Sequence, residues 1–226
     1  MGEALTNLSY DAWKQYIFDH PVADDPWYND DESDYWDEES NPDTTVQFMT
    51  RLFNEAGTLP DTYSLEQIAQ GLTYIVEPGV SGYAPLLGDD SPVPWELRQP
   101  CLRAMERVFA DLFAPYCEQV LYHVDTDPKP SLNKICYQWW VRLPFRGRPD
   151  DAHREKFDRA YLDVMEATLQ IKSVPCNEAT LHGLGYWHDQ HPGHVARIVD
   201  EFVKSTRTLN PDLHYYARRA RRGEIV

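Results

Sequence analysis

The chain has 226 residues and a formal net charge of −16 at pH 7, and it contains seven Trp and fourteen Tyr. This length allows one large domain with a substantial core. Because nucleic acids and anionic membranes attract cationic surfaces, the acidic balance excludes a general role in binding either one.

No run of about eighteen apolar residues could span a bilayer, and the chain does not open with a charged-then-apolar leader. The four cysteines lie far apart and form no C-x-x-C pair, which indicates reduced thiols in a core rather than disulfides or zinc ligands. We therefore expect a soluble, cytoplasmic protein whose residues 1–226 form a single all-α domain.

The first expected helix begins at Ser9, a favourable N-cap residue, and ends near His20, before Pro21. An acidic loop follows over residues 21–43, and half of the residues from 24 to 43 are acidic while none is basic. Such a block usually stays solvated, but this one also contains four aromatic residues. Two alternatives remain: the rings pin the loop to the body of the protein, or the segment folds on a basic partner.

If this loop recognises a partner, its aromatic rings and the carboxylates between them are the predicted contacts, because aromatic residues contribute heavily to interface energy. The predicted partner-binding residues are Trp27, Tyr28, Asp30, Asp31, Asp34, Tyr35 and Trp36.

Two capping boxes predict the next helices. Residues 44–47 should open a helix that ends at Gly57, and residues 64–67 should open another that ends before Pro78. A long loop rich in Gly and Pro is expected over residues 78–94, and loops of this length are often functional.

Apolar residues at helical spacing predict a helix over 95–113, with a kink or a fresh start at Pro100, and a further piece from Pro115. Residues 131–143 also fit a helix, although the alternation of Trp and Val suits a strand. A long helix is expected over 151–172, and a terminal helix follows Asn210 and ends in four arginines, which complement the helix dipole.

Residues 176–206 form the clearest unit, two short amphipathic helices joined by a tight turn as an antiparallel αα-hairpin, with Pro192 opening the second helix. The pattern of Leu181 and Leu184, then Asp189, Pro192 and Val195, then Arg197 resembles the HEAT class of helical repeats. It departs from that class because Arg197 comes one residue late and the first helix contains Gly183 and Gly185. The resemblance implies a repeat-like fold and, by association, protein binding. We expect an irregular array of about eight to ten helices built from αα-hairpins.

Four histidines fall between His182 and His194, and histidine is the commonest metal ligand near neutral pH. The residues that could hold a ligand or metal are Glu178, His182, His188 and His191. Their spacing matches neither H-E-x-x-H nor the Glu-x-x-His step of di-iron bundles. Structural roles at helix ends therefore account for them better, and we predict no cofactor.

The sequence favours a non-enzymatic protein-interaction module that binds another, basic protein through the acidic loop or a helical groove. An immunity or antitoxin-like role is one version of this hypothesis. The alternative is a metal-dependent enzyme that uses the histidine cluster.

Overall fold

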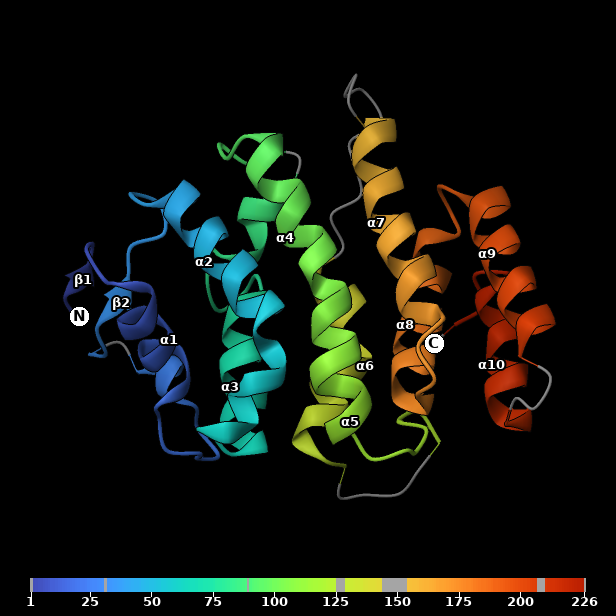
Figure 1. Cartoon of the computed structure of the whole chain (residues 1–226), viewed down its shortest axis with the longest axis horizontal. Helices are drawn as coiled ribbons and strands as arrows, with labels where there is room; N and C mark the ends of the chain where they lie inside the picture. The colour runs from blue at the N-terminus through green and yellow to red at the C-terminus, as the bar shows by residue number, and fades with distance from the viewer. Residues whose placement is uncertain are drawn as a thin grey trace.

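The computed structural model describes residues 2–30, 32–88, 90–124, 129–143, 154–206 and 210–225. Its helices follow one another along the long axis in chain order and form two layers (Figure 1). In one layer each helix contacts the next in the order α2 (Pro42–Asn54), α4 (Trp95–Arg107), α7 (Arg154–Leu169) and α9 (Pro192–Ser205). The other layer runs in the same way through α1 (Tyr10–Phe18), α3 (Leu65–Val76), α6 (Ser131–Arg142), α8 (Val174–Trp187) and α10 (Pro211–Ala220). The predicted all-α class is confirmed.

The strand content of the described residues is one short parallel pair at the N-terminal end of the array. It joins β1 (Ala4–Leu5) to β2 (Tyr35–Trp36), with Ala4 opposite Tyr35. This pair lies beyond α1, at the left of Figure 1.

Several helix ends lie where local chemistry predicts them. Ser9 accepts a hydrogen bond from the backbone N–H of Ala12 at the start of α1. Ser64 and Gln67 form both halves of the capping box that opens α3. Pro192 occupies the first position of α9, and Asn210 caps α10 by accepting a hydrogen bond from the backbone N–H of Asp212.

The capping box predicted over 44–47 is wrong for α2, because the N-cap is Asn41 and the helix begins at Pro42, three residues earlier than the box implies. Proline suits this first position because it lacks an N–H that would otherwise be unsatisfied. Thr44, the predicted cap, therefore lies inside the first turn, and the hydroxyl of the next residue, Thr45, donates to the Asn41 carbonyl oxygen at 2.8 Å. Gly57 does not end the helix either: it lies within a 3-10 segment, η2 (Ala56–Asp61), and a Cβ there would approach Asp111 to 3.0 Å.

The region from 78 to 124 differs from expectation in two places. The loop over 78–94 contains a 3-10 turn, η3 (Ala84–Leu87), and buries Tyr83, so it is part of the core. Pro100 lies inside α4, which continues past it into a π-helix (Val108–Phe113) and then α5 (Ala114–Tyr116). The piece predicted from Pro115 ends after one turn, and residues 117–124 form a turn-rich connection.

Residues 131–142 form a helix and not a strand. Trp139 and Trp140, which are adjacent in the sequence, are both buried, whereas a half-exposed strand would bury only one of them. The part of the long helix predicted before residue 154 lies outside the described residues, and α7 ends at Leu169.

The αα-hairpin of α8 and α9 is present. A Cβ on Gly183 would come within 2.4 Å of the Trp140 Cβ, and one on Gly185 within 2.3 Å of Ile225. Both glycines therefore permit close packing.

The buried apolar side chains of the whole array form one continuous cluster. No helix in the described ranges has the length and apolar character to cross a membrane.

Candidate functional site

The acidic segment is fixed to the N-terminal end of the array by backbone hydrogen bonds. The N–H of Tyr35 donates to the Glu3 carbonyl oxygen at 3.1 Å, and the N–H of Asp37 donates to that of Leu5 at 3.0 Å. In addition, the Asp34 carboxylate accepts the N–H of Glu3 at 2.8 Å. The segment therefore has a defined conformation without a partner.

Aromatic rings supply the second attachment of this segment. Trp27 begins a 3-10 turn, η1 (Trp27–Asn29), and its ring stacks on His20 with the centroids 4.0 Å apart. The same ring lies 4.8 Å from Tyr74 of α3. Trp36 is 1% exposed, and its indole N–H donates to the Thr45 hydroxyl at 2.7 Å. Of the two alternatives, the structure has the loop that is pinned by its rings.

The predicted partner-binding residues fall into three groups. Asp30, Asp34 and Tyr35 are exposed, the last of these by 42% of its surface. Trp27 and Tyr28 are half-buried. Trp36 belongs to the core, so a partner cannot reach its ring in this conformation, and Asp31 lies outside the described residues.

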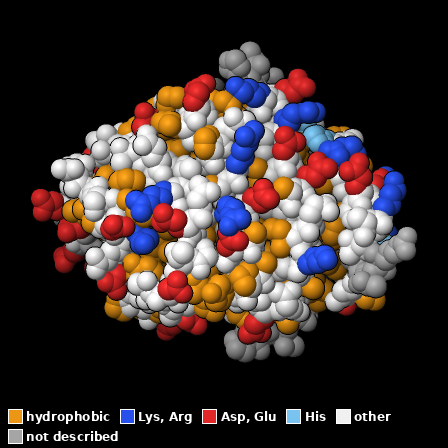
Figure 2. Space-filling model, in the orientation of Figure 1, with side chains coloured by type: hydrophobic (Ala, Val, Ile, Leu, Met, Phe, Trp, Pro, Cys, Tyr) orange, Lys and Arg blue, Asp and Glu red, His pale blue; other side chains and the backbone are white. Residues whose placement is uncertain are grey.

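The surface of this segment is strongly acidic. Residues 1–43 contain thirteen Asp and Glu and one Lys, a net charge of −12 out of −16 for the whole chain. At the left edge of Figure 2, acidic side chains stand without basic neighbours. Six exposed carboxylates make up what we call the acidic face: Asp24, Asp25, Asp30, Glu32, Asp34 and Glu39.

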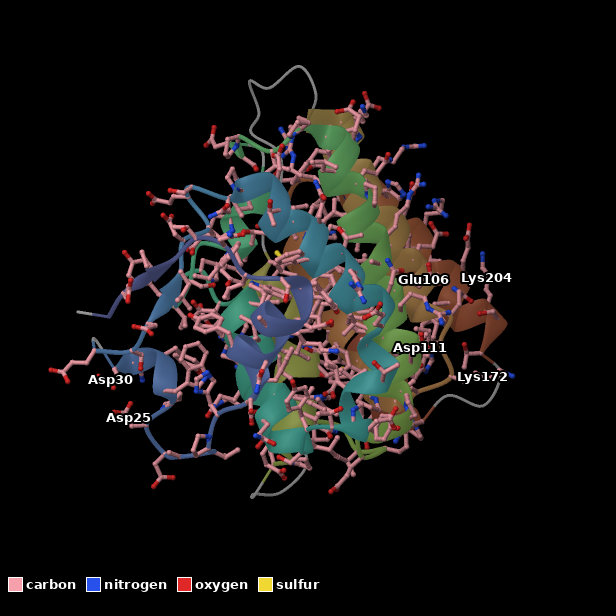
Figure 3. All side chains as sticks on the ribbon, turned by 60° about the vertical axis from the view of Figure 1, so that its left-hand side comes forward. Asp25, Asp30, Glu106, Asp111, Lys172 and Lys204 are labelled. Carbon is pink, nitrogen blue, oxygen red and sulfur yellow. The ribbon has the colours of Figure 1, made fainter. Side chains whose placement is uncertain are left out.

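None of the ion pairs found within the described ranges includes a member of the acidic face. Asp25 and Asp30 point away from the body of the protein in Figure 3. Elsewhere on the surface, carboxylates pair with arginine: Glu166 with Arg197 at 2.9 Å, and Asp200 with Arg221 at 2.7 Å. The acidic face is thus an uncompensated concentration of negative charge.

The four predicted ligand residues do not converge on one site, and the two that belong to α8 have structural partners. The fully buried Glu178 carboxylate accepts the backbone N–H groups of Tyr122 at 2.7 Å and His123 at 3.0 Å, and it also bonds the His123 Nδ1. His182, one turn further along, shares a hydrogen bond of 2.5 Å with the Tyr216 hydroxyl. Both side chains therefore fix the 117–124 connection and α10 to α8.

Two more aromatic residues extend this buried network. The Tyr216 hydroxyl bonds that of Tyr137 at 3.1 Å, and the Tyr137 ring stacks on His182 at 4.2 Å. Burial, together with the nearby His123, lowers the pKa of His182 to about 4, and burial raises that of Tyr137 to about 12. At neutral pH the imidazole and phenol are therefore uncharged, which suits a structural network.

His188 and His191 lie apart from this network. His188 packs against Gly223, where an added Cβ would come within 2.8 Å of Nδ1. Nε2 of His191 lies 2.6 Å from the buried Asp158 carboxylate, a partner that the sequence pattern did not indicate. Within the described ranges, one group of three potential ligands converges within 4.8 Å, and it consists of Asp163, Glu166 and His194. None of the four predicted ligand residues belongs to it, and Glu166 already binds Arg197.

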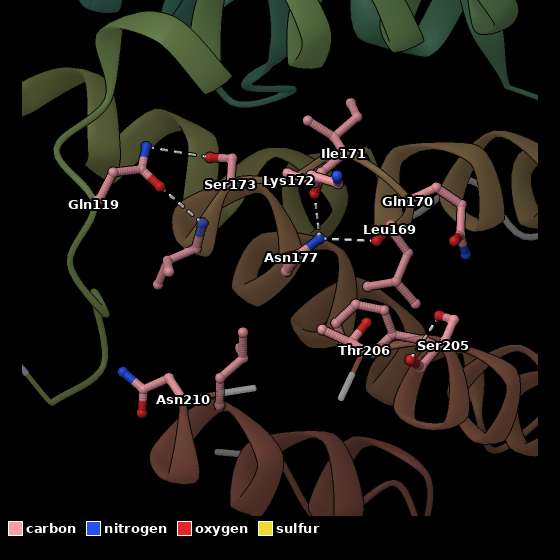
Figure 4. A pocket seen from close by; sticks show the side chains of 13 residues that line it. Gln119, Leu169, Gln170, Ile171, Lys172, Ser173, Asn177, Ser205, Thr206 and Asn210 are labelled. Carbon is pink, nitrogen blue, oxygen red and sulfur yellow. Dashed lines mark hydrogen bonds between the residues drawn. The ribbon is translucent and has the colours of Figure 1, made fainter. Parts of the chain in front are cut away.

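A cavity of about 550 Å³ lies where α7, α8, α9 and α10 meet (Figure 4). Two of its polar side chains, those of Asn177 and Gln119, serve helix ends. The Asn177 amide donates to the Leu169 and Ile171 carbonyl oxygens at 2.8 and 2.9 Å, and Gln119 accepts the N–H of Val174 at 3.0 Å. These groups are engaged within the fold, so the acidic face is the stronger candidate for recognition.

Compared with protein-family models, with curated proteins and with solved structures, the chain matches none.

Proposed function

We propose that this protein is a non-enzymatic interaction module that binds a basic protein through its acidic face. The observation that carries the proposal is the set of six exposed carboxylates that have a defined backbone frame and no arginine or lysine partner within the described ranges. A cationic protein surface would supply the missing counter-charge.

Electrostatics supports this reading. Like charges held close together repel one another, so the concentration of negative charge on the acidic face does not itself stabilise the isolated fold. Opposite charges across an interface accelerate association and select partners more than they raise affinity. At physiological ionic strength the screening length is about 8 Å, so binding should weaken steeply as salt is added.

The proposed partner class fits an immunity or antitoxin-like role, in which an acidic protein neutralises a basic one. We also retain the resemblance of residues 176–206 to HEAT repeats as a proposal, which the two-layer order of helices supports. The four buried free thiols are compatible with a cytoplasmic, reducing environment.

The test compares two variants of equal charge. One neutralises four members of the acidic face: Asp24→Asn, Asp25→Asn, Asp30→Asn and Asp34→Asn. The control neutralises four exposed carboxylates on other helices: Glu66→Gln, Glu96→Gln, Glu106→Gln and Glu155→Gln.

Each protein is immobilised, incubated with native extract at low and high salt, and the bound proteins are identified by mass spectrometry. We expect a basic protein that binds the wild type and the control, and that is lost from the acidic-face variant and at high salt. Identical bound proteins in every sample would refute the proposal.

A further inference from the structure

A small cavity lies within the acidic face, between the 3-10 turn η1 and α3. Its volume is about 220 Å³. Five aromatic residues line it: Tyr16, Trp27, Tyr28, Tyr35 and Tyr74. The space is several times the share of one water molecule, about 30 Å³, but below the roughly 300 Å³ at which small-molecule pockets begin. It therefore suits the end of one side chain.

The planes of neighbouring rings are steeply inclined to one another. Tyr16 meets Trp27 edge to face, at 5.2 Å and 75°, and Trp27 meets Tyr28 at 5.6 Å and 73°. The hydroxyls of Tyr16 and Tyr74 bond each other at 3.0 Å and hold two of the walls together. An aromatic ring attracts a cation that lies over its face, so a small space lined by several rings favours a cationic group.

Two carboxylates of the acidic face also line the cavity, those of Asp30 and Asp34. Asp30 accepts the N–H of Glu32 at 3.0 Å, and Asp34 accepts the N–H of Glu3 at 2.8 Å. These hydrogen bonds position both groups while leaving their charge without an ion pair inside the described ranges. An anionic side chain would be repelled here.

Among the described residues, the charge of Arg142 acts on Tyr28, one of the rings that line the cavity. Arg142 forms an ion pair with Glu77, so that its charge is largely compensated. Glu38, half-buried beside Tyr16, adds negative potential from another side. Burial raises the pKa of Tyr16, Tyr28 and Tyr74, and the three phenols are therefore neutral at pH 7.

We propose that this aromatic cavity binds the alkylammonium end of a lysine side chain on the basic partner. The proposal rests on the proposed function and specifies its contact: the rings attract the cation, and the two aspartates supply its counter-charge. An ammonium group that carries methyl groups should bind best, because it loses less hydration on entering an aromatic site.

The test uses nuclear magnetic resonance to follow the Trp27 indole N–H, assigned with the variant Trp27→Phe. The probe is a short neutral peptide with one trimethyllysine. Its matched control contains the uncharged carbon isostere, which has the same shape. We expect the trimethyllysine peptide to shift the Trp27 signal and the isostere to bind at least about ten-fold more weakly.

Two variants test which side chains contribute to this binding. Asp30→Asn with Asp34→Asn should weaken binding of the trimethyllysine peptide several-fold while leaving the rings in place. Tyr215→Ala, which removes an exposed ring outside the cavity, should leave binding unchanged. Equal binding of the isostere, or no shift at Trp27, would overturn the proposal. Binding of choline as tight as that of the peptide would also overturn it, because the site would then serve a small free alkylammonium ion.

The two proposals fail separately. If a basic protein binds the acidic face but the peptide does not shift Trp27, the cavity proposal is wrong and the proposed function stands. If the peptide binds but no basic protein depends on the acidic face, the proposed function is wrong and the cavity remains a site for alkylammonium groups.

Discussion

The buried His182 makes the stability of this protein depend on pH in a predictable direction. Its pKa is about 4 in the folded protein, against an ordinary value of 6.5, because burial disfavours the charged imidazole. Between these two values the unfolded chain binds a proton that the folded protein does not. Stability should therefore fall as the pH is lowered through this window.

The magnitude follows from the width of the window. One pKa unit corresponds to about 1.4 kcal/mol, so a fall from pH 7.5 to pH 5 should cost about 2 kcal/mol through His182. Carboxylates such as Glu166, whose pKa its Arg197 partner holds below the usual 4.5, are mostly ionised in both states over this range and contribute little.

The assay is urea unfolding at pH 7.5 and pH 5 of the wild type and His182→Asn, which removes the titrating ring but keeps an acceptor near Tyr216. The wild type should lose about 2 kcal/mol more than the variant on acidification. The control His214→Asn removes a histidine of α10 whose ring takes no part in the network, and it should behave as the wild type does. An equal pH dependence of the wild type and His182→Asn would refute this reasoning.

Three further predictions concern packing and metal. Phe202→Ala should destabilise the protein by about 3 kcal/mol, at the lower end for a buried Phe because this side chain already borders a cavity; a loss under about 1 kcal/mol in urea unfolding would contradict its placement. Gly183→Ala should cost about 1–2 kcal/mol because its Cβ would overlap Trp140, whereas Gly193→Ala, with open space around it, should be neutral or stabilising; equal effects would argue against the close approach of α6 and α8. Elemental analysis of protein purified without a histidine tag should find no stoichiometric zinc, iron or manganese, and a bound metal lost in His188→Ala or His191→Ala would instead favour the metal-dependent enzyme.

Local chemistry made some helix ends predictable from the sequence. Ser64 and Gln67 lie three residues apart and complete their capping box without any distant partner. The similar pattern at 44–47 was misleading because Pro42 supplies an earlier start, which places Thr44 inside the helix and not at its N-cap. The hydrogen bond from the Trp36 indole to the Thr45 hydroxyl depends on the tertiary structure, which the spacing of residues does not encode.

The same distinction applies to the candidate sites. Glu178 and His182 lie four residues apart, a spacing that puts both on one face of a helix, but their partners His123 and Tyr216 come from other elements. Likewise, Trp27 and Tyr28 stood out in the acidic loop, whereas Tyr74 appeared only as part of a helix. The cavity between them forms when α3 packs beside the acidic segment, so no local pattern could reveal it.

The central claim, that the acidic face contacts a basic protein, is tested most directly by zero-length cross-linking. A carbodiimide joins a carboxylate to a lysine amine only where the two touch. Applied to the protein in native extract and followed by mass spectrometry of the joined peptides, it reports which carboxylates meet a partner. The account predicts cross-links concentrated on Asp24, Asp25, Asp30 and Asp34 and joined to lysines of a basic protein. Cross-links spread evenly over exposed carboxylates of other helices, such as Glu66, Glu106 and Glu155, would contradict it.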